Sequence, residues 1–253
     1  MRIDKNKIMK HLLLLLGILV SMTAAHVVFA QNEGTIQYEV RVNMHRSLPQ
    51  DRAEMKEMIP EFNVHKSRLI FRDGESLFAN VENEEDDEEF GEDNGPVRIR
   101  MRRAMNEYYY NFSTARRVTL QEFLGKNFII EDSLQPLPWK LLDESKQVLG
   151  HNCRKAVWYN EERKQTVVAW YSDKLPAFLG PETFNSLPGT VLEVDINEGE
   201  RQIIATSFSS DKLRKGELKA PSKGERITEE GFRVMMEEQR KRMGGNGNII
   251  IRN

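Results

Sequence analysis

The chain has 253 residues, of which 37 are lysine or arginine and 39 are aspartate or glutamate, so its formal net charge is −2. This near balance argues against nucleic acid as a partner, because nucleic-acid-binding domains usually carry a clear excess of positive charge. Cys153 is the single cysteine, which excludes a disulfide within the chain. The length suits one domain that buries a sizeable core without cross-links.

The first thirty residues have the three parts of a secretory signal peptide. Basic residues in the first ten positions precede an apolar run over 12–20, and the triplet Val28-Phe29-Ala30 is a typical cleavage site. We expect cleavage between Ala30 and Gln31, export to the bacterial periplasm, and a single domain over 31–253. The apolar run is shorter than the roughly 20 residues of a membrane-spanning helix, so no membrane span is expected after the signal is removed.

Two elements are predicted at the start of the exported part. Residues 35–45 alternate apolar and polar side chains, with Ile36, Tyr38 and Val40 on one face, which predicts a half-buried strand. The segment 49–60 begins and ends at prolines and spaces its apolar residues among charged ones. This pattern predicts a short amphipathic helix.

A hairpin and a charged segment follow. Asp73-Gly74 lies between two apolar-rich runs in 67–78, which is a strong signal for a β-hairpin. Residues 82–95 are rich in contiguous acids, unlike the alternating acids of a calcium loop, and predict a mobile solvated loop. Residues 97–102 alternate apolar side chains with arginine and predict a strand. An alternative sets the acids against this basic strand in a hairpin, although exposed ion pairs are weak.

The rest of the chain predicts many short strands and a second helix. Thr228 can cap a helix over 228–243 that has acids in its first turn and bases in its last, and 248–252 predicts a final strand. Many short strands at close spacing favour an antiparallel meander, a sandwich or a barrel. The predicted strands are 108–112, 116–120, 128–130, 156–159, 166–171, 191–196 and 201–208.

One pair of residues is a candidate metal site. His151 and Cys153 are two apart on a predicted strand, so their side chains point the same way and could offer ligands to copper or zinc. A structural zinc site normally has about four protein ligands, and only two are visible here. The alternative is that Cys153 is buried and packs as a small apolar side chain.

No catalytic pattern is visible. The sequence has no nucleophile elbow, no phosphate-binding glycine loop and no dinucleotide-binding fingerprint, so we expect neither an enzyme nor a cofactor. Three tryptophans, Trp139, Trp158 and Trp170, lie in or beside predicted strands, where core packing is the simplest role.

The stretch 180–193 reads Gly-Pro-Glu-Thr-Phe-Asn-Ser-Leu-Pro-Gly-Thr-Val-Leu-Glu and resembles the signature of the GLPGLI family of exported Bacteroidetes proteins. Residues 132–156 and 169–176 match the same family in order and spacing. The sequence departs from the signature at Ser186, where the family has glycine, and at Thr190-Val191, where it has Leu-Ile. The serine puts in doubt any backbone conformation that only glycine adopts readily.

The function of the GLPGLI family is unknown, and the resemblance implies mainly a fold. It implies a mainly β (α+β) protein with a curved antiparallel sheet or half-open barrel, covered by the helices 49–60 and 228–243. The motif segment is then either a buried loop that plugs one side of the sheet or the lip of a binding pocket. The residues concerned are Trp170, Gly180, Pro181, Phe184, Leu187, Pro188 and Gly189.

These observations predict a periplasmic, non-enzymatic binding or accessory module. Its partner would be an apolar or peptide ligand, or an envelope protein, held against the apolar side of the sheet. The alternative is a protein that handles copper or zinc through His151 and Cys153. Candidate residues to line an interior cavity are Tyr38, Val40, Phe71, Phe78, Tyr109 and Trp170.

Overall fold

The computed structural model describes residues 32–46, 48, 56–57, 59–81, 87–90, 99–102 and 105–242. The chain divides into two units, Met1–Ala30 and Gln31–Asn253, and every described residue belongs to the second. The predicted signal peptide and the predicted strand at 248–252 therefore lie outside the described residues. Within the described ranges, no helix is both long and apolar enough to cross a membrane.

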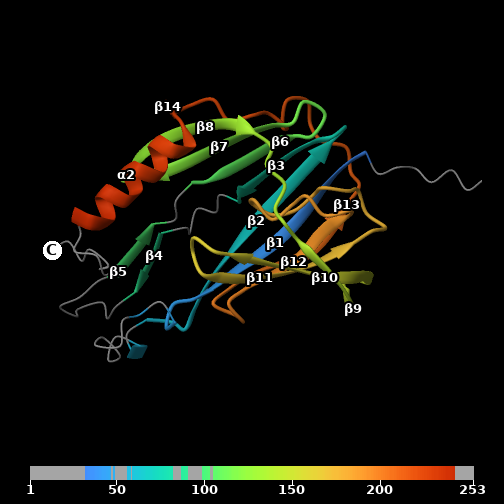
Figure 1. The fold of residues 1–253 in the computed structure, drawn as a ribbon, viewed down its shortest axis with the longest axis horizontal. Coiled ribbons are helices and arrows are strands. Elements are labelled where there is room, and N and C mark those ends of the chain that lie inside the picture. Colours follow the sequence, from blue (N-terminus) through green and yellow to red (C-terminus); the bar gives the residue numbers. More distant parts are fainter. Residues whose placement is uncertain are drawn as a thin grey trace, which may run out of the picture. The chain divides into compact units, whose positions relative to one another are not determined.

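The described part is built on a twelve-stranded sheet (Figure 1). All neighbouring strands in it are antiparallel except β14 and β8, and β14 and β9 are its two open edges. The mainly β, antiparallel fold class is confirmed, as an open sheet. In spatial order the strands are β14 (Glu225–Ile227), β8 (Lys126–Ser133), β7 (Arg116–Phe123), β6 (Glu107–Asn111), β3 (Glu75–Asn80), β2 (Phe62–Arg72), β1 (Glu33–Asn43), β13 (Arg201–Ser209), β12 (Thr190–Ile196), β11 (Gln165–Ser172), β10 (His151–Asn160) and β9 (Lys140–Val148).

The sheet consists of two meanders that join where β1 pairs with β13. We call the strands from β1 to β8 the first half and those from β13 to β9 the second half. The chain passes from β8 to β9, and so from the first half to the far edge of the second, through residues 134–139. We call this segment the crossover. Leu137 and Trp139 of the crossover pack against the main core.

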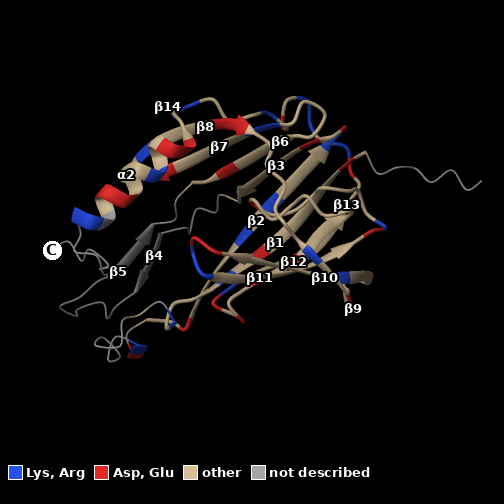
Figure 2. Cartoon of the chain, in the orientation of Figure 1, with Lys and Arg blue, Asp and Glu red and all other residues tan. Residues whose placement is uncertain are grey.

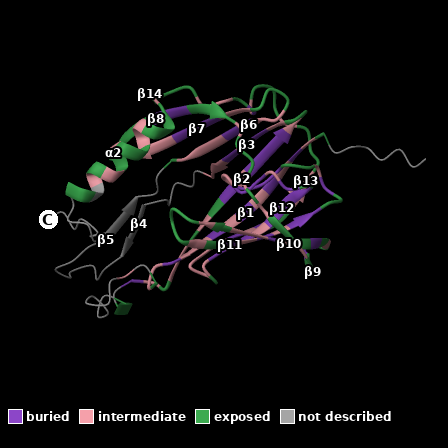
Figure 3. Cartoon of the chain, in the orientation of Figure 1, coloured by how far each residue is buried: buried purple, intermediate pink, exposed green. Residues whose placement is uncertain are grey.

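The centre of the sheet is the most deeply buried part, and Figure 3 shows buried residues along β1, β2, β12 and β13. Ile36, Tyr38 and Val40 on β1 are fully buried, which confirms the predicted alternation of this strand. The Tyr38 hydroxyl donates to the main-chain oxygen of Val191 over 2.6 Å. A buried hydroxyl needs such a partner, and this bond ties the first strand to β12 in the second half.

Two tight turns set the register of their hairpins. Asp73 and Gly74 have φ angles of 50° and 81°, which suit a two-residue turn between antiparallel strands and confirm the predicted hairpin. Leu149 and Gly150, with φ angles of 50° and 75°, form the same kind of turn between β9 and β10. The edge strand β9 was not predicted, because its mostly exposed side chains give no apolar alternation.

The helix α2 (Glu229–Arg242) confirms the second predicted helix. Thr228 caps it, since its Oγ1 accepts a hydrogen bond from the Gly231 amide over 3.0 Å. Figure 2 shows acidic residues near its start and basic ones at its end, as the helix dipole favours. The ring of Phe232 packs edge-on against Phe128, so α2 lies along β8. The helix predicted at 49–60 lies mostly outside the described residues, and Lys56-Glu57 form a short 3₁₀ turn.

The acidic segment is not entirely a loop, which corrects one prediction. β4 (Asp87–Phe90) pairs antiparallel with β5 (Ile99–Arg102) in a small two-stranded sheet. The register places Asp87 opposite Arg102 and Glu89 opposite Arg100. The alternative hairpin of acids against the basic strand is therefore present at the level of the backbone, because cross-strand neighbours of opposite charge are compatible. The remainder of 82–95 lies outside the described residues.

Candidate functional site

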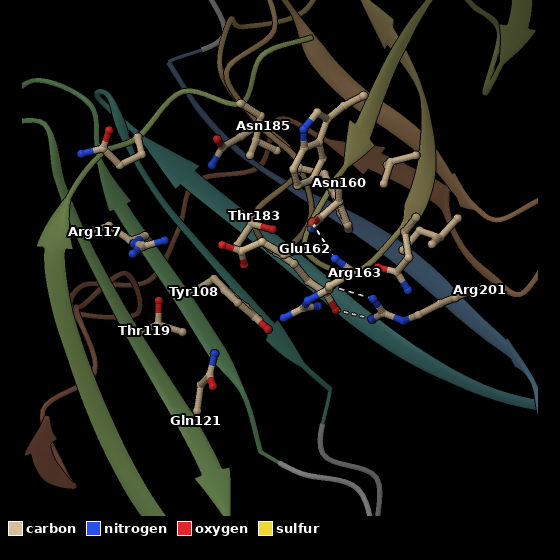
Figure 4. A pocket seen from close by; sticks show the side chains of 18 of the residues that line it. Tyr108, Arg117, Thr119, Gln121, Asn160, Glu162, Arg163, Thr183, Asn185 and Arg201 are labelled. Atoms are coloured by element: carbon tan, nitrogen blue, oxygen red, sulfur yellow. Dashed lines mark hydrogen bonds and ion pairs between the residues drawn. The ribbon is translucent and has the colours of Figure 1, made fainter. Parts of the chain in front are cut away.

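A cleft of about 510 Å³ lies between the two halves of the sheet (Figure 4). Tyr108 on β6 and Gln121 on β7 line it on one side. Asn160 and Arg163, around the turn between β10 and β11, and Arg201 at the start of β13 line it on the other. This volume is within the usual range of small-ligand sites, which is about 300–1,000 Å³. We call it the polar cleft.

Strand alternation separates the polar cleft from a small second core. Tyr109 and Val118 belong to an apolar cluster on one face of β6 and β7. Tyr108, Tyr110 and Arg117, at the alternate positions, line the cleft. Because successive side chains of a strand point to opposite faces, the first half buries one face and offers the other to a ligand.

The cleft lining is rich in groups that both donate and accept hydrogen bonds. Its side-chain amides are those of Asn43, Gln121, Gln135, Asn160, Gln165 and Asn185. Its charged residues are Arg117, Arg163 and Arg201 with Glu162, Glu182, Glu200 and Glu229, which leaves one negative charge in excess. Tyr108, Tyr110 and Trp158 add aromatic surface. Such a lining suits a polar ligand that is close to neutral.

A partly buried ion pair stands in the wall of the cleft. Arg201 donates from Nη1 to Glu182 Oε2 over 2.8 Å and from Nη2 to Glu182 Oε1, and the dashed lines at Arg201 in Figure 4 mark this pair. Burial by itself would lower the pKa of Arg201, but the hydrogen bonds and the charge of Glu182 more than offset it and raise the pKa. The two-pronged geometry fixes Glu182 in orientation as well as in place.

A second cavity of about 190 Å³ adjoins the first. Tyr108, Glu182 and Arg201 line both cavities, and His65 and Asn80 line the second alone. Burial, and to a lesser degree the charge of Glu182, raises the pKa of the Tyr108 hydroxyl. Tyr108 is therefore a neutral hydrogen-bonding group at any physiological pH.

The motif segment supplies one rim of the cleft and also packs into the core. Leu179, Phe184 and Leu187 belong to the main core. Glu182 and Asn185, which lie between these residues in the sequence, line the cleft. Main-chain hydrogen bonds close the loop. The Phe178 amide donates to the main-chain oxygen of Leu187 over 3.0 Å, and the Val191 amide donates to that of Leu179 over 2.8 Å. The segment thus combines features of both interpretations of the motif, the buried loop and the lip of a pocket.

Close backbone approaches explain the two motif glycines. A Cβ atom on Gly180 would lie 1.9 Å from the main-chain oxygen of Phe184, and one on Gly189 would lie 2.2 Å from that of Ser172. Neither position can accept a side chain without movement of the backbone. Ser186, where the family signature has glycine, has a φ of 67°, in the left-handed region that glycine adopts most readily.

The predicted interior residues form the core. Tyr38, Val40, Phe71 and Phe78 are buried members of the main cluster, and Tyr109 belongs to the second. Trp170 does not line the polar cleft. Its ring lies under the ammonium groups of Lys146 and Lys155, at 4.6 and 5.9 Å from the ring centroid.

The His151–Cys153 pair has the features of a packed core. Cys153 is fully buried and its thiol lies 3.6 Å from the main-chain oxygen of His151. Burial raises the pKa of the Cys153 thiol to about 11, which disfavours the thiolate that binds metals. The described residues hold no group of three or more His, Cys, Asp or Glu side chains placed to bind a metal ion. Metal binding by this pair stays a prediction without support.

No pattern in the sequence indicates that Arg117, Asn185 and Arg201 share a cleft. Arg117 was only part of a basic start to a predicted strand, and Asn185 was only one residue of the motif stretch 180–193. They come together because β7, the motif loop and β13 converge there (Figure 4). Only the position of Asn185 within a glycine-proline motif could have drawn attention to it.

Residues 159–193 match the model of a family described as "Protein of unknown function (Porph_ging)". The matched stretch runs from the end of β10 through β11 and the motif loop into β12. This match is compatible with the resemblance to the GLPGLI family. A comparison with curated proteins found no match.

The fold is similar to solved structures of PNGF-II in two space groups. The structure in P21 has a TM-score of 0.54 and 15% sequence identity, over 83% of this chain and 34% of that chain. The structure in C2 has a TM-score of 0.54 and 16% identity, over 82% and 33%. This chain thus corresponds to about a third of the length of PNGF-II. At this level of identity the likeness concerns the fold alone.

Proposed function

We propose that this protein is a non-enzymatic binding module that holds a peptide segment in the polar cleft. The observation that carries the proposal is the cleft itself, an open space of about 510 Å³ with side-chain amides around it and nearly balanced charges. Each peptide bond offers one donor and one acceptor. Asparagine and glutamine side chains offer the same two groups, so they can pair with an extended peptide on either side.

Charge and packing favour a peptide over an apolar ligand. The apolar residues first considered for a cavity lining are packed in the core, whereas the cleft exposes amide, carboxylate, guanidinium and phenol groups. An apolar ligand would remove these groups from water without hydrogen bonds, at a cost of roughly 1–3 kcal/mol for each group. A peptide would offer these polar groups hydrogen-bond partners in place of the displaced water.

We assign no reaction to the cleft, since three of its four carboxylates already serve structural contacts. Glu182 binds Arg201, Glu229 binds Arg117, and Glu200 accepts from Asn197 over 2.6 Å. A general acid or base needs a free proton-transfer partner in the substrate position. These groups instead hold the walls of the cleft in place.

We further propose that the chain is a GLPGLI-family protein of the periplasm, exported through a signal peptide that is cleaved after Ala30. The motif over 180–193 and the three-part leader support this assignment. Mass spectrometry of the protein from the envelope fraction of a bacterial host should give a chain that begins at Gln31. A chain that retains Met1 would contradict export by cleavage.

Calorimetry tests the binding proposal. Residues 31–253 would be titrated with a mixture of N-acetylated, C-amidated tetrapeptides of neutral polar composition. The Gln121→Trp variant fills the cleft from β7, and Ser207→Trp places the same ring on an exposed position of β13 outside it. We expect binding by the wild type and Ser207→Trp and loss of binding in Gln121→Trp. Equal binding by all three, or none by the wild type, would overturn the proposal.

A further inference from the structure

One end of the polar cleft holds a buried amide without an acceptor. Asn185 is 3% exposed, and its Oδ1 accepts a hydrogen bond from the Ser186 hydroxyl over 2.9 Å. Its Nδ2 is buried and has no hydrogen-bond partner among the described residues. A buried donor without a partner costs about 1–3 kcal/mol, so its retention at a cleft calls for an explanation in terms of a ligand.

A second buried donor comes from the facing strand. The Arg117 side chain is 15% exposed, and its Nη2 binds Glu229 at the start of α2 and lies 3.7 Å from Asp132 on β8. Its Nε, like the Asn185 amide, is buried without an acceptor in the described part of the chain. Both residues line the polar cleft, and Figure 4 labels them in it.

Tyr110 connects these two donors. Burial raises the pKa of its hydroxyl, while the positive charge of Arg117 and the amide of Asn185 act on the same hydroxyl in the opposite direction. Tyr110 therefore lies close to both side chains, although it forms no hydrogen bond of ordinary geometry with Asn185 Nδ2. Its neutral phenol completes a group of three polar side chains at one end of the cleft.

The charges around this group select against an anion. The single positive charge of Arg117 is already opposed by Glu229 and Asp132. A carboxylate or phosphate placed here would meet two acids and one base, so it would be repelled at close range. A neutral acceptor oxygen meets no such repulsion and can take hydrogen bonds from both donors.

We infer that Asn185 Nδ2 and Arg117 Nε form a subsite for the carbonyl oxygen of a neutral amide. The inference rests on the proposed peptide-binding function and adds which atom of the peptide is recognised. Two donors on one carbonyl use both of its lone pairs. Ligand binding would then supply the acceptors that the two buried donors lack, which gives affinity without any new charge.

The test uses the neutral peptide N-acetyl-Ala-Ala-Ala-amide as its probe. Arg117→Lys keeps the positive charge near Glu229 but has no Nε–H donor, and Asn185→Leu removes the amide while keeping the branched shape of the side chain. Arg116→Lys is the matched control, because Arg116 lies next in sequence, points to the other face of β7 and binds Glu131 over 2.6 Å. Melting temperatures establish that each variant folds, and if Asn185→Leu does not, Arg117→Lys carries the test.

We expect Arg117→Lys to weaken peptide binding about tenfold, the effect of one lost hydrogen bond to a carbonyl, and Arg116→Lys to leave it unchanged. Acetate and inorganic phosphate at millimolar concentration should not compete. Equal affinity of wild type and Arg117→Lys, with binding still blocked by Gln121→Trp, would overturn the subsite and leave the cleft proposal standing. Competition by either anion would also overturn it, and no peptide binding by the wild type would overturn both.

Discussion

The indole nitrogen of Trp139 donates a hydrogen bond to the main-chain oxygen of Asn185 over 2.8 Å. Trp139 ends the crossover, and Asn185 lies in the motif loop, so this bond fixes the loop to a segment 46 residues away in sequence. The same indole packs edge-on against Trp158, which lines the cleft. The position of the Asn185 side chain thus depends on a backbone contact outside the cleft.

We predict that Trp139→Phe lowers both stability and peptide affinity. The ring contact with Trp158 is largely retained, but the hydrogen bond to Asn185 is lost, which should cost about 1 kcal/mol of unfolding free energy. Guanidinium unfolding measures the first effect, and calorimetry with N-acetyl-Ala-Ala-Ala-amide measures the second. Wild-type affinity in a destabilised Trp139→Phe would show that the bond does not position the loop for binding.

Gly180 should not tolerate alanine. Because the added Cβ would lie 1.9 Å from the main-chain oxygen of Phe184, the motif loop must shift, and we expect a loss of at least about 3 kcal/mol. Gly199→Ala is the control, since Gly199 has a φ of 91° but open space around it. That variant should lose only the roughly 1 kcal/mol of left-handed strain. Equal melting temperatures for the two variants would contradict the close approach.

Trp170 should matter for stability and not for binding. In Trp170→Leu the ring that faces Lys146 and Lys155 is lost, and each cation–π contact at a partly exposed site is worth about 0.5–1 kcal/mol. We expect a destabilisation of about 1–2 kcal/mol in denaturant unfolding and unchanged affinity for the neutral peptide. A loss of peptide affinity without a loss of stability would show that Trp170 belongs to the binding site.

Cys153 should make stability fall at alkaline pH. The folded thiol has a pKa of about 11, above the ordinary 9.0 that the unfolded chain restores. A raised folded pKa of an acid stabilises the fold below the unfolded pKa, and this contribution is lost as the pH rises from 9 toward 11. Cys153→Ala removes this component, so its unfolding free energy should fall less over that range. If the unfolding free energies of the wild type and Cys153→Ala changed equally between pH 9 and 11, the burial of the thiol would be contradicted.

The sequence predicted best where local rules decide the structure. The alternation of Ile36, Tyr38 and Val40, the Asp73-Gly74 turn and the Thr228 cap are all properties of a few neighbouring residues, and each is present in the structure. β9 was missed because both of its faces are mostly exposed, and β14 because it has only three residues. Edge strands carry little apolar pattern, so periodicity cannot find them.

The candidate site could not be predicted, because it is made by long-range pairing. Arg201 meets Glu182, and Arg117 meets Glu229 across 112 residues. No spacing rule relates such positions before the strand order is known. The motif did locate the loop, but it could not show that Ser186 would adopt a left-handed backbone conformation, with a φ of 67°.

Backbone NMR of labelled residues 31–253 during titration with N-acetyl-Ala-Ala-Ala-amide shows whether the polar cleft binds a neutral peptide. We expect saturable shifts of the amide signals of Tyr110, Arg117 and Asn185, which line the cleft, and little change along the exposed edge strand β9. Shifts confined to β9, or spectra that do not change at millimolar peptide, would contradict a peptide-binding cleft.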